Sequence, residues 1–315
     1  MNCNNCKNCN NNNSFYSFFI NKEHLIQFFL NYFKYSYLVF VGIRFATLVL
    51  KIILHWEEGG NMKPVIGITS YYVKAYEIEE CRPRGIIGQD MVMSTIDYPR
   101  AVEKAGGIPF IIPMINNIEF IEGVVEKIDG LILSGGPDIY PLLYDSSIHI
   151  GCKKTVAERD RFELKILGKA IEHDKPVFGI CKGFHMLNIF YGGTLYQDIY
   201  LECKTNIAHS GSKASSYEPC HTVYFEENSV FDGIYNNKSY VNSYHHQAIK
   251  DIGSELKAVG WSTDDNLIEA IIHKNNDFIL GVQWHPEMMV SHYEEQLEIF
   301  KYFINLIRRN KHDQN

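Results

Sequence analysis

Short apolar stretches alternate with amphipathic ones from residue 62 onward. PVIGIT at 64–69 and PVFGI at 176–180 have the length and the β-branched content of buried strands. Further strands are predicted at 108–113, 128–134, 254–261, 267–273 and 277–284, and helices at 97–107, 155–174 and 293–309. Apolar strands that alternate with helices indicate a central, mostly parallel sheet with helices on both faces.

The longest of these helices has an apolar face and a candidate start signal. Phe162, Ile166 and Ala170 recur at a spacing of four, which predicts that they face the core. Thr155 and Glu158 fit a capping box, in which two side chains satisfy backbone amides of the first turn. The sequence therefore predicts a helix that begins beside Thr155.

Residues 1–61 differ in character from the rest of the chain. An Asn-rich tract carries Cys3, Cys6 and Cys9, and this spacing suggests a metal site. The tract supplies neither a fourth ligand nor a fold around the cysteines. We therefore do not expect metal to bind there.

The apolar run at 37–54 is a second unusual feature of this extension. Its length approaches the roughly 20 residues that cross a bilayer. Arg44 and Lys51 interrupt it, and each such charge costs about 2.5 to 3.5 kcal/mol near the membrane centre. The run is a poor anchor, and it also lacks the short apolar core and small-residue cleavage site of a signal peptide.

A third interpretation of the extension comes from the genetic code. Residues 57–61, EEGGN, can be encoded by purine-rich codons that resemble a bacterial ribosome-binding site directly before the ATG of Met62. The preceding abundance of Asn, Lys, Ile, Phe and Tyr is what AT-rich upstream DNA would encode. We hypothesise that the functional protein is a single domain of residues 62–315, which N-terminal sequencing of the native protein would test.

Composition and charge are those of a globular protein. Of the 315 residues, 46% are hydrophobic and 21% are charged. The net charge of −7 and the lack of a basic run exclude a typical nucleic-acid-binding surface. Cysteines beyond the first nine residues are scattered without paired spacing, which indicates reduced thiols in a cytoplasmic protein.

GICKG, residues 179–183, joins a predicted strand to a helix-like segment. Its G-x-C-x-G form in this context is the cysteine version of a nucleophile elbow. Gly179 and Gly183 leave room for a tight turn that forces Cys181 into a strained conformation. The thiol then lies at the carboxyl end of a strand and at a helix N-terminus, whose dipole favours the thiolate. A buried structural cysteine is the competing interpretation, so partner residues must decide.

QWHPE, residues 283–287, supplies these partners. His285 follows a predicted strand, and Pro286 fixes the chain so that Glu287 can reach back to the imidazole. A thiol-dependent mechanism needs a base for the thiol proton and an acceptor that orients the base. Cys181, His285 and Glu287 are therefore predicted to form a catalytic triad.

SGGPD, residues 134–138, follows another predicted strand. Paired glycines at a strand end let backbone N–H groups face a ligand oxygen. We assign the oxyanion hole to the N–H groups of Gly136 and of Lys182, the residue after the nucleophile. A simple turn is the alternative, because Gly-Gly-Pro-Asp is favourable turn sequence. Asp138 and Tyr140 come next and are candidates for lining the pocket.

These motifs in this order resemble the class I glutamine amidotransferase superfamily. Within it, the gamma-glutamyl-gamma-aminobutyrate hydrolase-like group (peptidase C26-like) is most similar, through GGPDIYPLLY, ERDRFEL, GICKGFHMLNIFYGGTLYQD and VNSYHHQAI. The similarity spans residues 62–290. It implies hydrolysis of a gamma-glutamyl amide through a thioester on cysteine, with no metal or organic cofactor.

Two positions depart from the family pattern. Lys182 stands where relatives usually have Arg, but its N–H is unchanged, so the oxyanion role is kept. His185 stands where relatives often have Gln, whose side chain commonly helps to hold the glutamyl group, so this departure bears on glutamate specificity. Ser243 and Tyr244 belong to a segment that borders the glutamyl pocket in the family, and we assign them, with His185, to substrate binding.

Other polar clusters have simpler interpretations. His245 and His246 suggest metal, but adjacent residues of a strand point to opposite faces, and no Asp, Glu or Cys partner has useful spacing. We therefore predict a structural role for them. Arg159, Asp160 and Arg161 match the family and are predicted to form a solvated or ion-paired helix face.

We therefore predict a flavodoxin-like three-layer α/β sandwich with a Cys181–His285–Glu287 triad that cleaves a gamma-glutamyl amide. The alternatives are a glutaminase subunit that supplies ammonia to a partner synthetase, and a non-catalytic gamma-glutamyl-binding module. The expected ligand is a small gamma-glutamyl molecule in the cytoplasm. For residues 62–315 we expect no metal, organic cofactor, nucleic acid or membrane partner, and a homo-oligomer is left open.

Overall fold

The computed structural model describes Gln27 and residues 62–73, 89–211 and 215–313. The predictions on an N-terminal metal site, an anchor and the start of the protein concern residues 1–61, so they lie outside the described residues apart from Gln27. The elements below belong to the unit Lys63–Asn315. Within the described ranges, no helix combines the length and the apolar content that a bilayer crossing requires.

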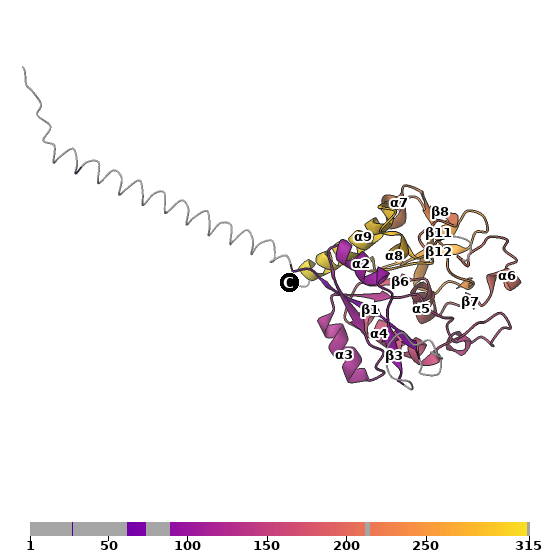
Figure 1. The fold of residues 1–315 in the computed structure, drawn as a ribbon, viewed down its shortest axis with the longest axis horizontal. Coiled ribbons are helices and arrows are strands. Elements are labelled where there is room, and N and C mark those ends of the chain that lie inside the picture. The colour runs from indigo at the N-terminus through magenta and orange to yellow at the C-terminus, as the bar shows by residue number, and fades with distance from the viewer. Residues whose placement is uncertain (1–26, 28–61, 74–88, 212–214, 314–315) are drawn as a thin grey trace, which may run out of the picture. The chain divides into compact units, whose positions relative to one another are not determined.

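The centre of the fold is a nine-stranded mixed sheet (Figure 1). Its strands are, from edge to edge, β4 (Ile108–Ile112), β1 (Val65–Thr69), β5 (Gly130–Leu133), β6 (Val177–Ile180), β13 (Ile279–Val282), β12 (Ile268–His273), β11 (Leu256–Ser262), β8 (His221–Phe225) and β9 (Lys238–Val241). The strands from β4 to β13 pair in parallel. In chain order they run second, first, third, fourth, fifth, which is the flavodoxin-like order. The predicted fold class is confirmed.

The other half of the sheet is antiparallel. β11, β12 and β13 lie where the sequence predicts strands, but each reverses the direction of the one before. The connections between them are too short for the crossover that parallel neighbours need. β8 and β9, which the sequence analysis missed, extend this half with the same alternation.

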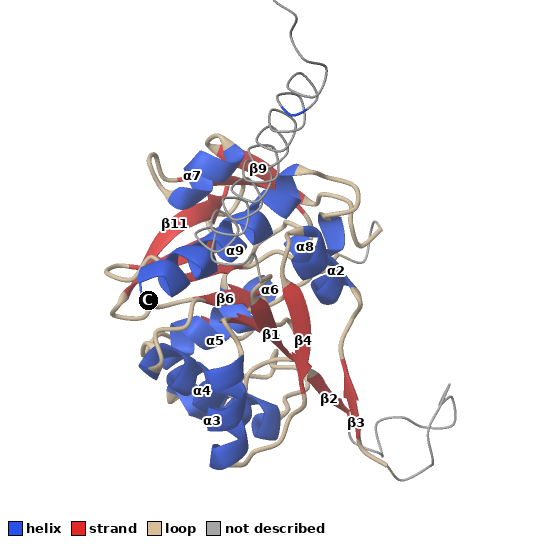
Figure 2. Cartoon of the chain, turned by 90° about the vertical axis from the view of Figure 1, so that its left-hand side faces the viewer, coloured by secondary structure: helices blue, strands red, loops and turns tan. Residues whose placement is uncertain are grey.

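Helices cover both faces of the sheet and complete the sandwich (Figures 1 and 2). One core cluster includes α2 (Asp97–Lys104), α7 (Val230–Tyr235) and α9 (Glu295–Asp313), and a second includes α3 (Ile118–Lys127), α4 (Ala157–Glu172) and α5 (Lys182–Phe190). Shorter elements are β2 (Tyr71–Val73), β3 (Met91–Met93), η2 (Pro141–Tyr144), β7 (Leu195–Tyr196), α6 (Ile199–Glu202), β10 (Ala248–Ile249) and α8 (Pro286–Met289).

Helix α4 confirms its predicted apolar face but not its predicted start. Its predicted core positions, including Phe162, are buried. The helix begins at Ala157, and the residue before it, Val156, has no side-chain oxygen that could cap an amide. Thr155 instead forms a β-bridge with Asp138. The capping box was therefore wrong, because a tertiary contact holds Thr155 outside the helix.

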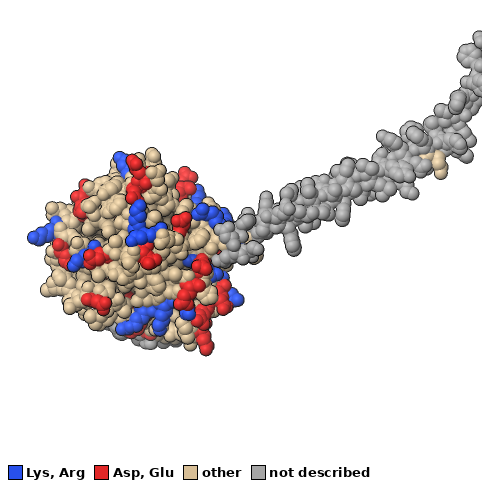
Figure 3. All heavy atoms as spheres, turned by 180° about the vertical axis from the view of Figure 1, so that it is seen from behind, with Lys and Arg blue, Asp and Glu red and all other residues tan. Residues whose placement is uncertain are grey.

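Surface charge and thiol state agree with the composition. Lys and Arg are interspersed with Asp and Glu on the face drawn in Figure 3, so this face has the mixed character of an ordinary globular-domain surface. The described cysteines are Cys152, Cys181, Cys203 and Cys220, and all of them are free thiols. The prediction of unpaired cysteines is confirmed for this part of the chain.

Candidate active site

Three neighbouring parallel strands bring the predicted motifs together. β5, β6 and β13 lie side by side in the sheet, so the loops that follow them leave from the same edge. Gly136 follows β5, Cys181 follows β6 and His285 follows β13. Open α/β sheets bind ligands at this carboxyl edge. The strand order places the thiol between the glycine loop and the imidazole.

Cys181 occupies a strained turn between β6 and α5. Its backbone has φ 53° and ψ −105°, a conformation that non-glycine residues rarely adopt. A Cβ added to Gly179 would lie 2.6 Å from the Gly183 carbonyl oxygen, and one added to Gly183 would lie 2.1 Å from the Leu133 carbonyl oxygen. A side chain at either position would push the turn off the sheet. The backbone geometry of the predicted elbow is confirmed.

An imidazole beside the thiol is held by a carboxylate. His285 Nδ1–H donates to Glu287 Oε1 over 2.7 Å, and the ring lies close enough to Cys181 for the charge of the thiol to act on it. Burial by itself lowers the pKa of His285, but the charges of Glu287 and Cys181 outweigh burial and raise the pKa well above its usual value. A protonated imidazole stabilises a neighbouring thiolate, which is the nucleophilic form of cysteine.

Two residues that the sequence analysis missed fix the position of His285. Asn242, directly after β9, accepts a hydrogen bond from the His285 N–H at 2.9 Å and donates one to its carbonyl oxygen at 3.0 Å. Trp284 is fully buried, and its Nε1–H donates to Gln296 Oε1 at 3.0 Å. Asn242 carries no local signal, because its partner lies 43 residues further along the chain.

The predicted oxyanion donors have unpaired amides. Within the described residues, no acceptor is found for the N–H of Gly136 or of Lys182. The Gly135 N–H differs, because it donates to the Tyr98 hydroxyl at 2.8 Å. Tyr98, also missed from sequence, is fully buried, and burial raises the pKa of its phenol. Two free amides next to a nucleophile are what a developing oxyanion requires.

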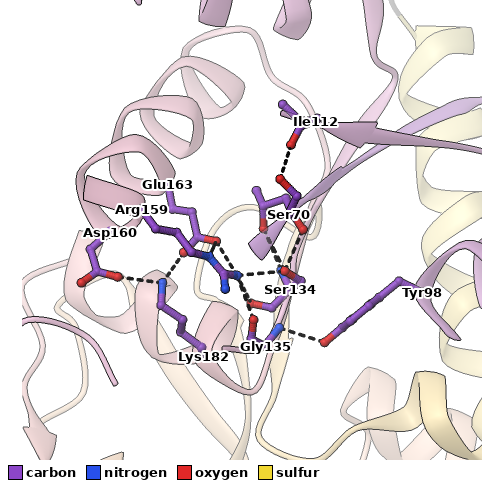
Figure 4. Close-up of polar contacts among 10 residues, drawn as sticks. Ser70, Tyr98, Ile112, Ser134, Gly135, Arg159, Asp160, Glu163 and Lys182 are labelled. Carbon is purple, nitrogen blue, oxygen red and sulfur yellow. Dashed lines mark hydrogen bonds and ion pairs between the residues drawn. The ribbon is translucent and has the colours of Figure 1, made fainter. Parts of the chain in front are cut away.

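Figure 4 shows a buried cluster of charges around the Lys182 side chain. Lys182 Nζ lies 2.9 Å from Asp160 Oδ1 and also pairs with Glu163, which accepts a hydrogen bond from Arg159 Nε at 2.8 Å. Burial acts to raise the pKa of Glu163, but the charges of Arg159 and Lys182 outweigh it and lower the pKa. Of the two predicted alternatives, the ion-paired one holds for Arg159 and Asp160, which pair with Glu163 and Lys182 inside the protein, whereas Arg161 is exposed.

The guanidinium of this cluster contacts the loop that carries Gly136, the predicted oxyanion donor. Arg159 Nη2 donates to Ser134 Oγ at 2.9 Å and to the Gly135 carbonyl oxygen at 2.8 Å. A Cβ added to Gly136 would lie 2.3 Å from Arg159 Nη1. Glycine is therefore needed for the loop to lie against the guanidinium, and the buried charges determine where the Gly136 amide is.

A small cavity of about 50 Å³ opens beside the thiol. It is lined by Gly136, Pro137, Asp138, Cys181, Lys182, His185, Tyr244, His245, His246 and Gln247. Of the predicted substrate-binding residues, His185 and Tyr244 line it. Ser243 does not, because its side chain is fully buried and its hydroxyl lies 3.0 Å from His209 Nδ1. The lining is mostly polar, which suits a polar ligand.

His185 is a neutral ring in this lining. Its Nε2–H donates to the Gln283 side-chain oxygen at 2.6 Å, and burial lowers the pKa of His185 to about 3. An uncharged imidazole can hydrogen-bond to a ligand but cannot form an ion pair with a carboxylate. Tyr244 also lines the cavity, and its carbonyl oxygen lies 4.0 Å from Cys181 Sγ.

The adjacent histidines point apart, as predicted, but each finds an acidic partner. His246 Nε2 lies 2.8 Å from Asp138 Oδ1, whereas His245 Nε2 lies 3.7 Å from Glu269 Oε1. Both belong to the irregular segment between β9 and β10 rather than to a strand. Asp138 lines the cavity as expected and Tyr140 does not. Partners far away in sequence explain why spacing alone did not reveal these pairs.

The arrangement can perform acyl transfer. A thiol in a strained elbow, an imidazole–carboxylate pair and two free amides meet at one cavity. These are the parts that attack a carbonyl, move a proton and stabilise an oxyanion.

Comparisons with known proteins agree with this site. The sequence model of the family Peptidase C26 matches residues 64–287. Protein NtpR of Enterococcus hirae is 32% identical over 245 residues, which cover 77% of this chain and 99% of that protein. Gamma-glutamyl-gamma-aminobutyrate hydrolase PuuD of Escherichia coli is 32% identical over 216 residues, which cover 66% of this chain and 83% of that protein. A solved structure from Thermoplasma acidophilum, named for a GMP synthase, covers 80% of this chain and 98% of its own at 19% identity and a TM-score of 0.53, and supports the fold alone.

Proposed function

The chain belongs to the peptidase C26 family, and we propose that it hydrolyses a gamma-glutamyl amide bond through Cys181. Family membership supports a hydrolase or amidotransferase-type enzyme. The single observation that carries the finer proposal is the thiol in a strained elbow with the His285–Glu287 pair beside it. The name of the Escherichia coli relative suggests the gamma-glutamyl substrate class.

In the first half-reaction the thiolate of Cys181 attacks the gamma-carbonyl carbon of the substrate. A C–S bond forms, and the carbonyl oxygen becomes an oxyanion that accepts hydrogen bonds from the amides of Gly136 and Lys182. The oxyanion then collapses, the C–N bond breaks, and the imidazolium of His285 gives its proton to the departing amine. A glutamyl thioester on Cys181 and a free amine result.

In the second half-reaction water replaces the amine. His285, now neutral, takes a proton from water as the water oxygen attacks the thioester carbon. The C–S bond breaks, glutamate leaves, and the thiolate–imidazolium pair is restored. Glu287 orients the ring and stabilises its charge but does not itself accept a proton in this scheme. One water is consumed for each amine and glutamate released.

Release of glutamate from a panel of gamma-glutamyl amides tests the proposal. We expect Cys181→Ala to lower turnover by at least about 10³-fold, because the members of such triads act as a unit. Cys152→Ala is the matched control: burial raises the pKa of Cys152 to about 11, so this free thiol is not a nucleophile at neutral pH. Near-normal turnover of every amide by Cys181→Ala would contradict the mechanism.

Two further measurements, together with the glutamate assay, distinguish the hydrolase from the two alternative functions. Glutamine hydrolysis that rises only when a synthetase is added would indicate a glutaminase subunit. Calorimetric binding of a gamma-glutamyl ligand without turnover would indicate a binding module. Release of glutamate by the isolated chain supports the hydrolase.

A further inference from the structure

Three buried histidines surround a buried glutamate outside the catalytic triad. We call His209, His221, His245 and Glu269 the His–Glu cluster. The ring centroid of His209 lies 4.6 Å from that of His221 and 4.7 Å from that of His245. Glu269 is on β12, His221 is on β8, and His245 is in the segment between β9 and β10. All four side chains are buried, and the proposed mechanism uses none of them.

The hydrogen bonds of the cluster leave a lone pair facing a carboxylate. His245 Nδ1–H donates to the Gln247 carbonyl oxygen at 2.8 Å, since a carbonyl can only accept. The other nitrogen, Nε2, then presents its lone pair toward Glu269 Oε1, 3.7 Å away. Two acceptors do not attract each other, so a positive group is needed between or beside them.

Further polar atoms of the cluster also lack partners. Within the described residues, no hydrogen bond is made by either oxygen of Glu269 or by either ring nitrogen of His221. The partner nearest to Glu269 given by these contacts is His221 Nε2, 3.2 Å from Oε1, and the two atoms make no hydrogen bond. Nearly all buried polar groups in proteins are satisfied. A cation bound among these side chains would give the unpaired oxygens of Glu269 and the unpaired nitrogens of His221 and His245 a partner.

The spacings within the cluster fit shared coordination better than hydrogen bonding. Glu269 Oε1 lies 3.2 Å from His221 Nε2 and 3.7 Å from His245 Nε2. A charge-assisted N–H···O bond is about 2.7 to 2.9 Å long, whereas two ligands at about 2.0 to 2.2 Å from one tetrahedral Zn²⁺ lie roughly 3.4 Å apart. One ligand atom each from His209, His221 and Glu269 lies within 4.8 Å of the others.

Both ring nitrogens of His209 have oxygen partners. Its Nε2 lies 2.9 Å from Asp265 Oδ2, and its Nδ1 lies 3.0 Å from Ser243 Oγ. In metal sites, the nitrogen that does not bind the ion is usually held by an oxygen of this kind. Metal binding through one nitrogen of His209 replaces the present hydrogen bond of that nitrogen, while the other nitrogen keeps its oxygen partner.

We propose that the His–Glu cluster binds a divalent transition metal of the Zn²⁺ class. The ligand atoms of His209, His221 and Glu269 lie within 4.8 Å of one another. We assign the fourth position to His245, whose Nε2 lies 3.7 Å from Glu269 Oε1; imidazole and carboxylate ligands of this kind suit Zn²⁺ and Co²⁺, and four protein ligands make a closed, structural site. The metal joins β8 and β12 to the segment that carries Tyr244 and His246 along the active-site cavity. Its role is to hold that segment in place. The sequence predicted no metal because these ligands are far apart along the chain.

Co²⁺ titration of the full chain tests this site. Cys3, Cys6 and Cys9 are replaced by Ser in every sample, so that the N-terminal tract cannot contribute thiolates. After removal of metal with a chelator, we expect visible absorption bands of tetrahedral Co²⁺ that saturate near one equivalent. Zn²⁺ at a hundredfold excess over Kd should raise Tm by about 5 to 10 °C.

Matched variants distinguish the cluster from other sites. Glu269→Gln and His221→Gln should abolish the Co²⁺ bands and the rise in Tm. The control is His273→Gln. His273 lies on β12 like Glu269, but it pairs with Glu255 at 3.4 Å, so this variant should keep the Co²⁺ bands and the rise in Tm. Absence of bands and of a Tm shift in the parent chain would overturn the proposal, as would unchanged binding by both cluster variants. If those variants do not fold, the parent titration decides. No measurement involves turnover, so the result is independent of the proposed hydrolase activity.

Discussion

Gly135 offers a direct test of how closely the imidazole is positioned. A Cβ added at this residue would lie 2.7 Å from His285 Cε1 and 3.1 Å from the Tyr98 hydroxyl. Carbon atoms in contact are normally about 3.5 to 4.0 Å apart, so the ring must move by roughly 1 Å in Gly135→Ala. A misplacement of this size can lower a rate by about 10²-fold. We expect that loss both in turnover and in the alkylation of Cys181.

The alkylation assay makes this test independent of the substrate. Iodoacetamide reacts with the thiolate, and the thiolate depends on the imidazole next to it. The backbone of Gly135 is not in the left-handed region, so Ala should fold there. Gly123→Ala, in α3 with no atom within 4 Å of the new Cβ, is the control and should keep the wild-type rate. A wild-type alkylation rate in a folded Gly135→Ala would refute the reasoning, as would an equal loss in the control.

Three further predictions concern groups that support the site. Lys182→Met should lower the free energy of unfolding by about 3 to 5 kcal/mol, because it leaves buried Asp160 and Glu163 with too little positive charge. Denaturant titration measures this loss, and an equal loss in Lys182→Arg would argue against a charge effect. The folded pKa of Glu163 lies below its ordinary 4.5, so the stabilisation it gives is present above pH 4.5 and is lost as the pH falls through the folded pKa. Glu163→Gln should therefore have a flatter stability profile on acidification, and an unchanged slope would count against this assignment. Asn242→Ala removes two hydrogen bonds to the backbone of His285; we expect a lower kcat with little change in KM, and a change confined to KM would contradict a role in positioning the base.

The parallel half of the fold was predictable because its signals are local. Each short apolar run, such as the one that became β6, marks a strand whose two faces are both covered. Strand direction was harder to predict, because it depends on whether a connection is long enough for a crossover. β11 and β12 were placed correctly as strands, but their antiparallel pairing came from the short loops between them.

In the site, too, residues within short motifs could be predicted, whereas residues that act through contacts remote in sequence could not. Cys181, His285 and Gly136 could be found because each follows a strand within a short motif. Asn242 and Tyr98 could not, because each acts through hydrogen bonds to a residue that is remote in sequence. Charged positions on a helix are usually solvated, so the burial of the Arg159 cluster depended on partners that no periodicity reveals.

The position of β13 in the sheet has a consequence for how the protein is made. β6 and the elbow are synthesised about a hundred residues before β13, which is the last of the described strands and inserts between β6 and β12. During synthesis Cys181 is therefore present before His285, the residue proposed to activate it. If the proposed mechanism holds, the site is complete only once β13 has inserted, and we expect chains that end before β13 to be inactive.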